Sequence, residues 1–199
     1  MSRARYGDEG QTVGIYIVAI AALFFLSFAY LAVGQASVAR NGAQTAADAA
    51  ALAAAREERD LLGNQFLAAL LAGDQAALRQ LLTYAAGEAG CGGAPGAAAA
   101  DYAADNQAEL TDCAPVFGPP GFRVAVRTLG TVGPSVVPGT EDIKAVAHAT
   151  AVLEPRCTLG GLSLPVVDFD CDNGPLDIDP TDAGFILDLS DFYTVHLSD

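Results

Sequence analysis

The sequence of 199 residues is poor in charge, and above all in positive charge. Charged residues make up 17% of it, against about 25% in an average soluble domain, while apolar residues make up 52%. There are 10 Lys and Arg against 24 Asp and Glu, which gives a formal net charge of −14. A field of this sign repels a phosphate backbone, which argues against nucleic-acid binding. The high apolar fraction argues equally against a disordered chain.

Residues and motifs that carry catalysis or bind metals are also scarce. There are two His and four Cys, and no Cys-x-x-Cys pair, so a zinc site is poorly supported. The sequence has no Gly-x-Ser-x-Gly and no His-Glu-x-x-His motif. The glycine-rich stretch around Cys91 lacks the Lys and Ser or Thr of a phosphate-binding loop. We therefore expect a protein that is not an enzyme and has no cofactor.

The apolar residues are concentrated near the N-terminus, where 30 consecutive residues between Glu9 and Arg40 carry no charge. The core of this run, Val13–Val33, would span about 31 Å as a helix, close to the hydrocarbon thickness of a bilayer. A buried soluble helix is one alternative, but the rest of the chain is too small to surround it. A cleaved signal peptide is the other, but its apolar core is usually shorter. We predict a retained transmembrane helix.

Small residues in and after this span indicate that it packs closely against other helices. Gly14, Ala22 and Gly34 would let a neighbouring backbone approach. The helical pattern then continues through an Ala-rich stem, Gln44–Ala55. Its stripe of Ala either packs on the protein's own domain or meets similar helices of other copies.

All four cysteines follow the span, and their even number is typical of an oxidising compartment. Three pairings are possible. We prefer Cys91–Cys113 with Cys157–Cys171, because each bond closes a short loop and would stabilise the fold by about 3 kcal/mol. Reduced structural thiols are the alternative. Basic residues near the span favour an N-terminus inside only weakly, so the cysteines are the better guide to orientation.

Further helices are expected after the stem. The stretch Leu61–Ala86 carries an apolar face, with Gly73 placed to end one helix and Asp74 to cap the next. Gly87–Gly96 is rich in Gly and is expected to be a loop. Ala97–Cys113 is predicted to form a third short helix.

The pattern then changes to the alternation typical of strands. Phe122–Leu129 and Ile143–Pro155 alternate apolar and polar residues and are predicted to form an antiparallel pair. Two such strands need a helix over one face to be stable. The stretch Gly184–Asp199 suits one further strand. The expected fold class is therefore α+β, with a long N-terminal helix, further short helices and a small antiparallel sheet.

The C-terminal segment Cys157–Asp199 holds nine Asp and no Lys or Arg. Alternating Asp residues suggest calcium ligands, and the candidates are Asp168, Asp170, Asp172 and Asp179. The EF-hand template requires Gly at its sixth position, which is Asn173 when counted from Asp168, so the template fails. Asp side chains also stabilise turns. We favour a solvated acidic loop over a calcium site.

Three features of the chain occur together. The N-terminal sequence DEGQ, Asp8–Gln11, leads into the apolar span, the span runs directly into QTAADAAALAAA, Gln44–Ala55, and AADNQAELTDC, Ala103–Cys113, precedes the alternating strands. Together they resemble the TadE/TadG-like family of the Tad, or Flp-type, pilus systems. The resemblance is good from Asp8 to about Ala55 and weaker over Ala97–Cys157.

The resemblance implies a pilin-like architecture and a non-enzymatic, membrane-anchored pilus component acting as a minor pilin with a tip, initiating or anchoring role. Its partners would be other pilus subunits and the membrane assembly platform. Pilin precursors carry a Gly with Glu at the fifth position after it. The fifth residues after the candidate processing sites Gly7 and Gly10 are Thr12 and Ile15, so processing is not expected. The competing hypothesis is a monomeric membrane-tethered module that binds calcium or a cell-wall component.

These inferences divide the chain into four segments. Residues 1–12 are expected in the cytoplasm and residues 13–33 in the membrane. Residues 34–96 would form the Ala-rich stem and its helices, and residues 97–199 an extracellular α+β head with an acidic end. The expected location is a bacterial cell membrane, crossed once with the N-terminus inside, or a surface pilus.

Overall fold

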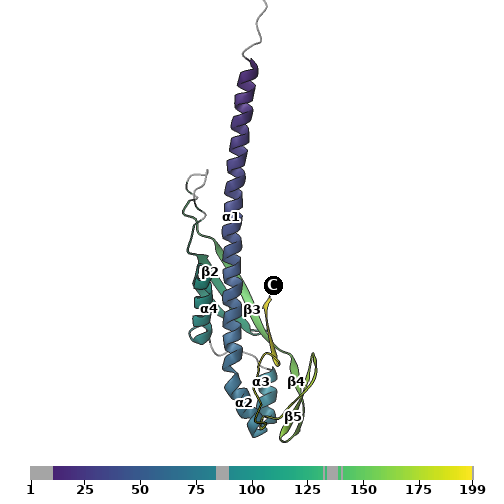
Figure 1. The fold of residues 1–199 in the computed structure, drawn as a ribbon. Coiled ribbons are helices and arrows are strands. Elements are labelled where there is room, and N and C mark those ends of the chain that lie inside the picture. The colour runs from purple at the N-terminus through teal and green to yellow at the C-terminus, as the bar shows by residue number, and fades with distance from the viewer. Residues whose placement is uncertain (1–10, 84–89, 132, 134–138, 140, 199) are drawn as a thin grey trace, which may run out of the picture.

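The computed structural model describes residues 11–83, 90–131, 133, 139 and 141–198. One long helix runs through the whole molecule, and an α+β head is packed around its C-terminal half (Figure 1). The predicted fold class is confirmed.

Helix α1, Gln11–Leu61, is continuous over 51 residues, which corresponds to about 76 Å. Its first half is built of the apolar residues of the predicted span and its second half of the Ala-rich stem. Three interior glycines do not interrupt it, since Ala, Leu and other strong helix formers surround them. Span and stem are thus one rigid element.

Two short helices follow α1 at the far end of the head, α2 (Gly63–Ala72) and α3 (Gln75–Thr83). The predicted caps between them are confirmed. Gly73 ends α2 in the left-handed conformation, with φ +62°, and its N–H donates to the carbonyls of the last turn. Asp74 Oδ1 accepts hydrogen bonds from the backbone N–H groups of Ala76 and Ala77, both at 3.0 Å.

The prediction of a third helix reaching Cys113 is wrong. Helix α4, Ala94–Asp105, is followed after two residues by strand β1, Ala108–Val116. The side chain of Asn106 donates to the carbonyl of Tyr102, and Gln107 takes a positive φ of 58°, so the chain turns out of the helix. Pairing with the next strand then overrides the helical preference of the residues that follow.

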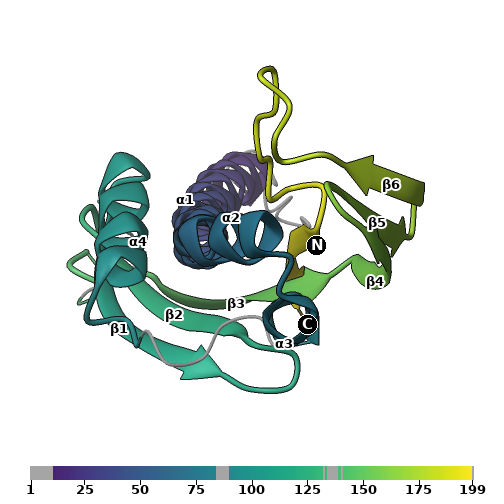
Figure 2. The ribbon, with the colours of Figure 1, turned by 90° about the horizontal axis from the view of Figure 1, so that it is seen from below.

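The main sheet has four antiparallel strands in the order β1-β2-β3-β7. Strands β2 (Gly121–Thr128) and β3 (Val146–Pro155) pair in antiparallel fashion as predicted, although β3 starts three residues later than expected. The predicted C-terminal strand is β7, Tyr193–Ser198, which pairs with the second half of β3. Helices α1 and α4 lie side by side on the concave face of this sheet (Figure 2).

The acidic segment is not a loop, and this prediction is also wrong. It forms a second antiparallel sheet of three strands, β4 (Cys157–Ser163), β5 (Val166–Cys171) and β6 (Gly174–Ile178). Val167 and Phe169 on β5 are buried, while the Asp residues between and after them face outward. The alternation of apolar and acidic residues is therefore the two-residue period of a half-buried strand.

Two hydrophobic cores lie one after the other along the molecule. The first joins the Ala stripe of α1 to α4 and to the inner face of the main sheet. The second is aromatic and joins α2 and α3 to the acidic sheet, with the rings of Phe66 and Phe192 in a tilted contact, 4.5 Å apart between ring centroids. Tyr193 is buried there, and its hydroxyl donates to the carbonyl of Leu81 at 2.9 Å. These two cores fix the head on the long helix.

Candidate functional site: the unpartnered half of the long helix

No part of the described head covers the N-terminal half of α1. Residues 12–42 are exposed or only partly buried, and the first fully buried residue is Ala43. The exposed side chains are large and apolar, for example Ile15, Phe25 and Tyr30, at 65%, 68% and 82% exposure. In the described part of the chain one helix is long and apolar enough to cross a membrane, and its best 18-residue window has a mean hydropathy of 2.4. We call residues 12–42 the free segment.

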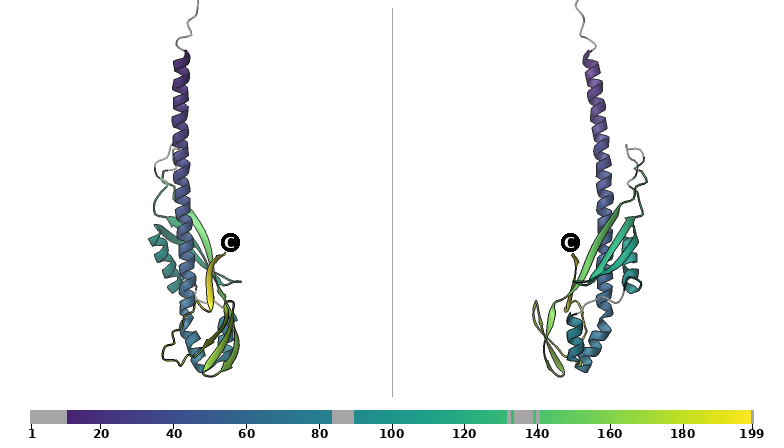
Figure 3. Two further views of the ribbon diagram at one scale, coloured as in Figure 1. Left: turned by 45° about the vertical axis from the view of Figure 1, so that its right-hand side comes forward. Right: turned by 180° about the vertical axis from the view of Figure 1, so that it is seen from behind.

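A short neck separates the span from the head. Val33 ends the predicted span and Ala43 begins the head core, which is a distance of about 15 Å along the helix. Arg40 is the one charged residue in this interval. The head therefore stands just beyond the end of the apolar surface rather than against it (Figure 3).

The three predicted packing residues all lie on the free segment, but they do not form one stripe. A Cβ atom added to Gly14 or Gly34 would have no neighbour within 4 Å, and Ala22 is exposed. At about 100° per residue, Ala22 lies roughly 80° from Gly14, and Gly34 lies roughly 120° further round. Small residues are thus offered to neighbours on more than one side of the helix.

The Ala stripe of the stem serves the protein's own head. Ala43, Ala47, Ala50 and Ala54 are fully inaccessible to solvent, because α4 and the main sheet cover them. Of the two roles considered for this stripe, the structure therefore shows packing within the chain. The surface left for other helices is the free segment.

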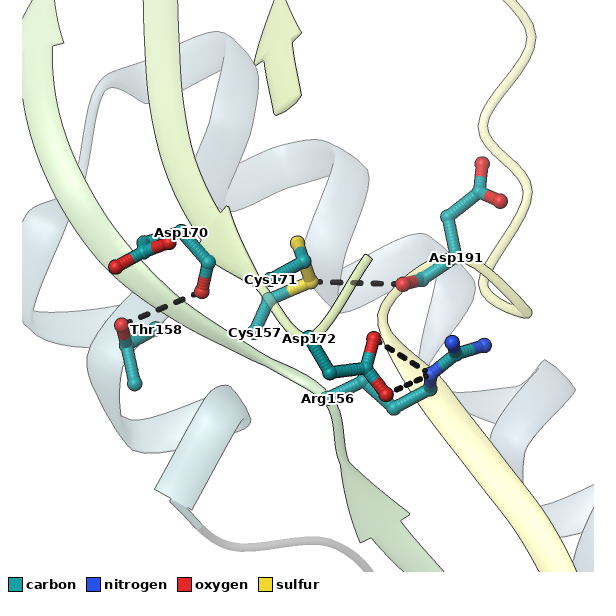
Figure 4. Close-up of a disulfide and its surroundings, with 7 residues drawn as sticks. All are labelled: Arg156, Cys157, Thr158, Asp170, Cys171, Asp172 and Asp191. Atoms are coloured by element: carbon teal, nitrogen blue, oxygen red, sulfur yellow. Dashed lines mark hydrogen bonds and ion pairs between the residues drawn. A yellow bond between two sulfur atoms is a disulfide. The ribbon is translucent and has the colours of Figure 1, made fainter. Parts of the chain in front are cut away.

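Both disulfides pair the cysteines as preferred from loop length. Cys91–Cys113 joins the segment before α4 to strand β1, with Cα atoms 5.7 Å apart. Cys157–Cys171 connects directly opposed residues of β4 and β5, with Cα atoms 3.9 Å apart (Figure 4). In the described part of the chain no cysteine is free.

An ion pair closes the end of the β4–β5 ladder beside the second disulfide. Arg156 Nε donates to both carboxylate oxygens of Asp172, at 2.9 and 3.1 Å (Figure 4). This hydrogen bond holds the pKa of Asp172 below its usual value. The Asp172 side chain is 55% exposed, so water weakens the ion pair, and the pair fixes the local geometry more than it stabilises the fold.

The four calcium candidates are not gathered into one site. Asp168 and Asp170 lie on β5, Asp172 is held by the ion pair just described, and Asp179 follows β6. Asp179 Oδ1 accepts hydrogen bonds from the backbone N–H and the hydroxyl of Thr181, at 2.9 and 2.6 Å. Among the described residues no group of three or more His, Cys, Asp or Glu side chains is placed to hold a metal ion.

A shallow groove of about 510 Å³ lies where α1 passes the open edge of β3. Gln44 on α1 donates to Asp48 Oδ1 at 2.7 Å and to the carbonyl of His148 at 3.3 Å, which ties the stem to the sheet. His148 and Arg123 line the groove, and Arg123 Nε lies 3.4 Å from the hydroxyl of Thr150. These contacts connect the stem and the sheet.

One buried group was missed from the sequence. Glu58 is 6% exposed, its Oε2 atom has no hydrogen-bond partner among the described residues, and burial raises the pKa of its carboxyl. It lies four residues after Ala54 and seven after Ala51, so it continues the buried stripe of α1. This spacing could have indicated from the sequence that Glu58 is buried, but the charged residues beside it favoured a solvent-exposed end of the helix.

Comparison with known proteins identifies the N-terminal part of the chain. Residues 10–57 match the family described as putative Flp pilus-assembly TadE/G-like. No curated protein and no solved structure matches the chain. The matched residues comprise the apolar span, the neck and the Ala stripe, whereas the candidate processing sites Gly7 and Gly10 lie outside the described residues. The likeness to the TadE/G-like family of Flp pilus-assembly proteins therefore lies in the long N-terminal helix, over residues 10–57.

Proposed function

We propose that this protein is a non-enzymatic, membrane-anchored, pilin-like component of a Tad pilus, with a tip, initiating or anchoring role. The observation that carries the proposal is the free segment: an exposed apolar half-helix joined without a break to a folded head. The match to the TadE/G-like family over the same residues supports it.

The physical argument rests on what can cover the free segment. Apolar surface of this extent is unfavourable in water and must be buried. A bilayer buries it, and so does a bundle of similar helices, so one helix can reside in a membrane and later pack among pilus subunits. The proposed topology has the N-terminus inside and the head outside, which agrees with two disulfides in the head.

The test separates packing from simple anchoring. We expect Ala22→Leu and Gly34→Leu to leave membrane insertion intact, because Leu is favourable in lipid. Both changes should reduce the number of pili and the co-purification of other pilus components, because a larger side chain keeps a neighbouring backbone away. The measurements are membrane fractionation and pilus counts in cells carrying each variant.

Val18→Leu is the matched control, since it changes an exposed apolar residue of the same span without filling a small site. It should fractionate and assemble like the unchanged protein. Normal pili with both Ala22→Leu and Gly34→Leu would contradict the packing role. The protein would then be better described as a membrane-tethered module, the competing hypothesis.

A further inference from the structure

The connection between β6 and β7, residues 179–192, contains a stretch that alternates like a strand but belongs to neither sheet. In Figure 2 the connection extends on the side of α1 and α2 opposite the main sheet. Phe185 and Leu187 are partly buried against the aromatic core. Ile186 between them is 87% exposed, and Asp188 is also exposed. This inward and outward alternation is the two-residue period of a strand.

Two turns hold this stretch in place. Before it, the backbone N–H of Gly184 donates to Asp182 Oδ1 at 2.9 Å. After it, the backbone N–H of Ser190 donates to Asp188 Oδ1 at 2.8 Å. Residues 185–188 therefore have a defined position, although they pair with no strand of either sheet.

The backbone at the centre of this stretch is free to pair. In the described part of the chain, no backbone group forms a hydrogen bond with the N–H or C=O groups of Ile186 and Leu187. A strand-like segment with unpaired backbone groups is a template for pairing with another chain. A peptide that adds a strand to such an edge gains affinity from main-chain hydrogen bonds and specificity from alternate side chains.

A groove of about 440 Å³ lies between this stretch and the end of α1. Arg59 and Asp60 line it on the helix side, and residues 186–189 line it on the other. Gly63 also lines the groove, and a Cβ atom there would lie 3.6 Å from Leu189, so a larger side chain would fill part of it. Arg59 lies about 39 Å along the helix from the end of the predicted span, so the groove is far from the apolar surface.

The charge around the groove favours a basic partner. Residues 179–192 contain four Asp and no Lys or Arg. Arg59 is paired with Asp60 at 2.9 Å, so these two charges offset each other. Hydrogen bonds from Ser190 hold the pKa of Asp188 below its usual value, so its carboxylate is charged at neutral pH. Because Ile186 and Asp188 are two residues apart, an apolar residue with a basic residue two positions away matches both.

We propose that this groove binds an extended segment of another protein, which pairs as a strand with residues 185–188 and carries an apolar residue with a basic residue two positions away on either side. The apolar side chain lies against Ile186, and one basic side chain lies opposite Asp188. The inference goes beyond the proposed function, because it concerns the head alone and does not depend on the anchor.

The probe is the capped peptide Lys-Thr-Val-Thr-Lys-Thr, labelled with fluorescein. Its two Lys and its Val share one face of a strand, and this pattern is the same in both chain directions. Binding is measured by fluorescence anisotropy with the purified full chain in detergent. Two control peptides carry Glu in place of both Lys, or a methyl group on every backbone nitrogen. Both should bind at least about tenfold less tightly, because one loses the charge match and the other loses its backbone donors.

Ile186→Ser tests the apolar contact in the protein. Its matched control is Phe117→Ser, because Phe117 is also exposed, at 72%, and lies in the turn between β1 and β2. We expect Ile186→Ser to weaken binding of the Lys peptide by about tenfold and Phe117→Ser to leave it unchanged. Hydrogen exchange at residues 184–188, measured by mass spectrometry, should slow when the Lys peptide binds, because its backbone pairs with theirs.

Equally tight binding of the Lys peptide and either control peptide would overturn the inference. So would a Lys peptide that does not bind, that binds Ile186→Ser as well as the unchanged chain, or that leaves hydrogen exchange at residues 184–188 unaltered. A chain that is dimeric alone and becomes monomeric with Ile186→Ser would mean that a second copy occupies the groove, which also contradicts the inference. None of these outcomes touches the proposed function, which membrane fractionation and pilus counts test separately.

Discussion

Replacing Glu58 should stabilise the head. Its Oε2 atom is buried without a hydrogen-bond partner, and a buried polar group in that state costs about 1–3 kcal/mol. Met has a similar length and no such group, so Glu58→Met should raise the free energy of unfolding at neutral pH by about 1–2 kcal/mol. Glu58→Gln should raise it less, because the amide keeps polar atoms in the same place.

The gain in the free energy of unfolding from Glu58→Met should depend on pH in a defined direction. Burial raises the pKa of Glu58 above its ordinary value of 4.5, so the folded state holds this proton more firmly than the unfolded state. Below the unfolded pKa both states are protonated and the charge penalty is absent. As the pH rises through the unfolded and then the folded pKa, the penalty grows to its full size. The advantage of Glu58→Met should therefore be largest at neutral pH, shrink as the pH falls through the raised pKa of the folded state, and be smallest below about pH 4.5.

The assay is urea unfolding of the full chain in detergent, followed by the near-ultraviolet circular dichroism of the buried aromatic cluster. Glu57→Met is the matched control, because Glu57 is the neighbouring residue and remains partly exposed. Its effect should stay within about 0.5 kcal/mol. A Glu58→Met protein that is less stable at neutral pH, or whose difference from the unchanged protein is the same at every pH, would refute the reasoning.

Two further predictions concern the head. Replacing both Cys157 and Cys171 with Ala should lower the free energy of unfolding by about 3 kcal/mol, because their disulfide closes a loop of 14 residues. Mass spectrometry of the unchanged exported protein should detect no free thiol. Four alkylatable cysteines would count against an exported head. The melting temperature should be the same in millimolar calcium and in chelator, because the candidate Asp residues are dispersed; a rise with calcium would restore the binding-module hypothesis, since a ligand of the folded state stabilises it.

Features set by nearby residues were predictable from the sequence. The caps at Gly73 and Asp74 depend on the backbone conformation of one residue and on the side chain of the next. The paired strands β2 and β3 follow from a clear alternation, and the long helix from an unbroken series of good helix formers. The preferred disulfides follow from loop length alone.

Features decided by distant residues were not predictable. The residues of β1 favour a helix by composition, but pairing with β2 makes them a strand. The many Asp residues of β5 concealed the buried Val167 and Phe169, whose partners Phe66 and Phe192 lie far away in the sequence. Glu58 has a charged sequence neighbourhood, and its burial depends on how the head closes around α1.

The Ala stripe of α1 imposes an order of events during synthesis. Residues 43–55 leave the ribosome early, yet their cover of α4 and the main sheet is complete only when β3 ends at Pro155, about a hundred residues later. At roughly 5–20 residues per second, the stripe waits for about 5–20 s before its cover is complete. Throughout that interval the nascent chain presents a smooth Ala face directly beside the emerging anchor. A chaperone or a neighbouring helix that recognises small residues would have its one opportunity then, and would be displaced when the head closes.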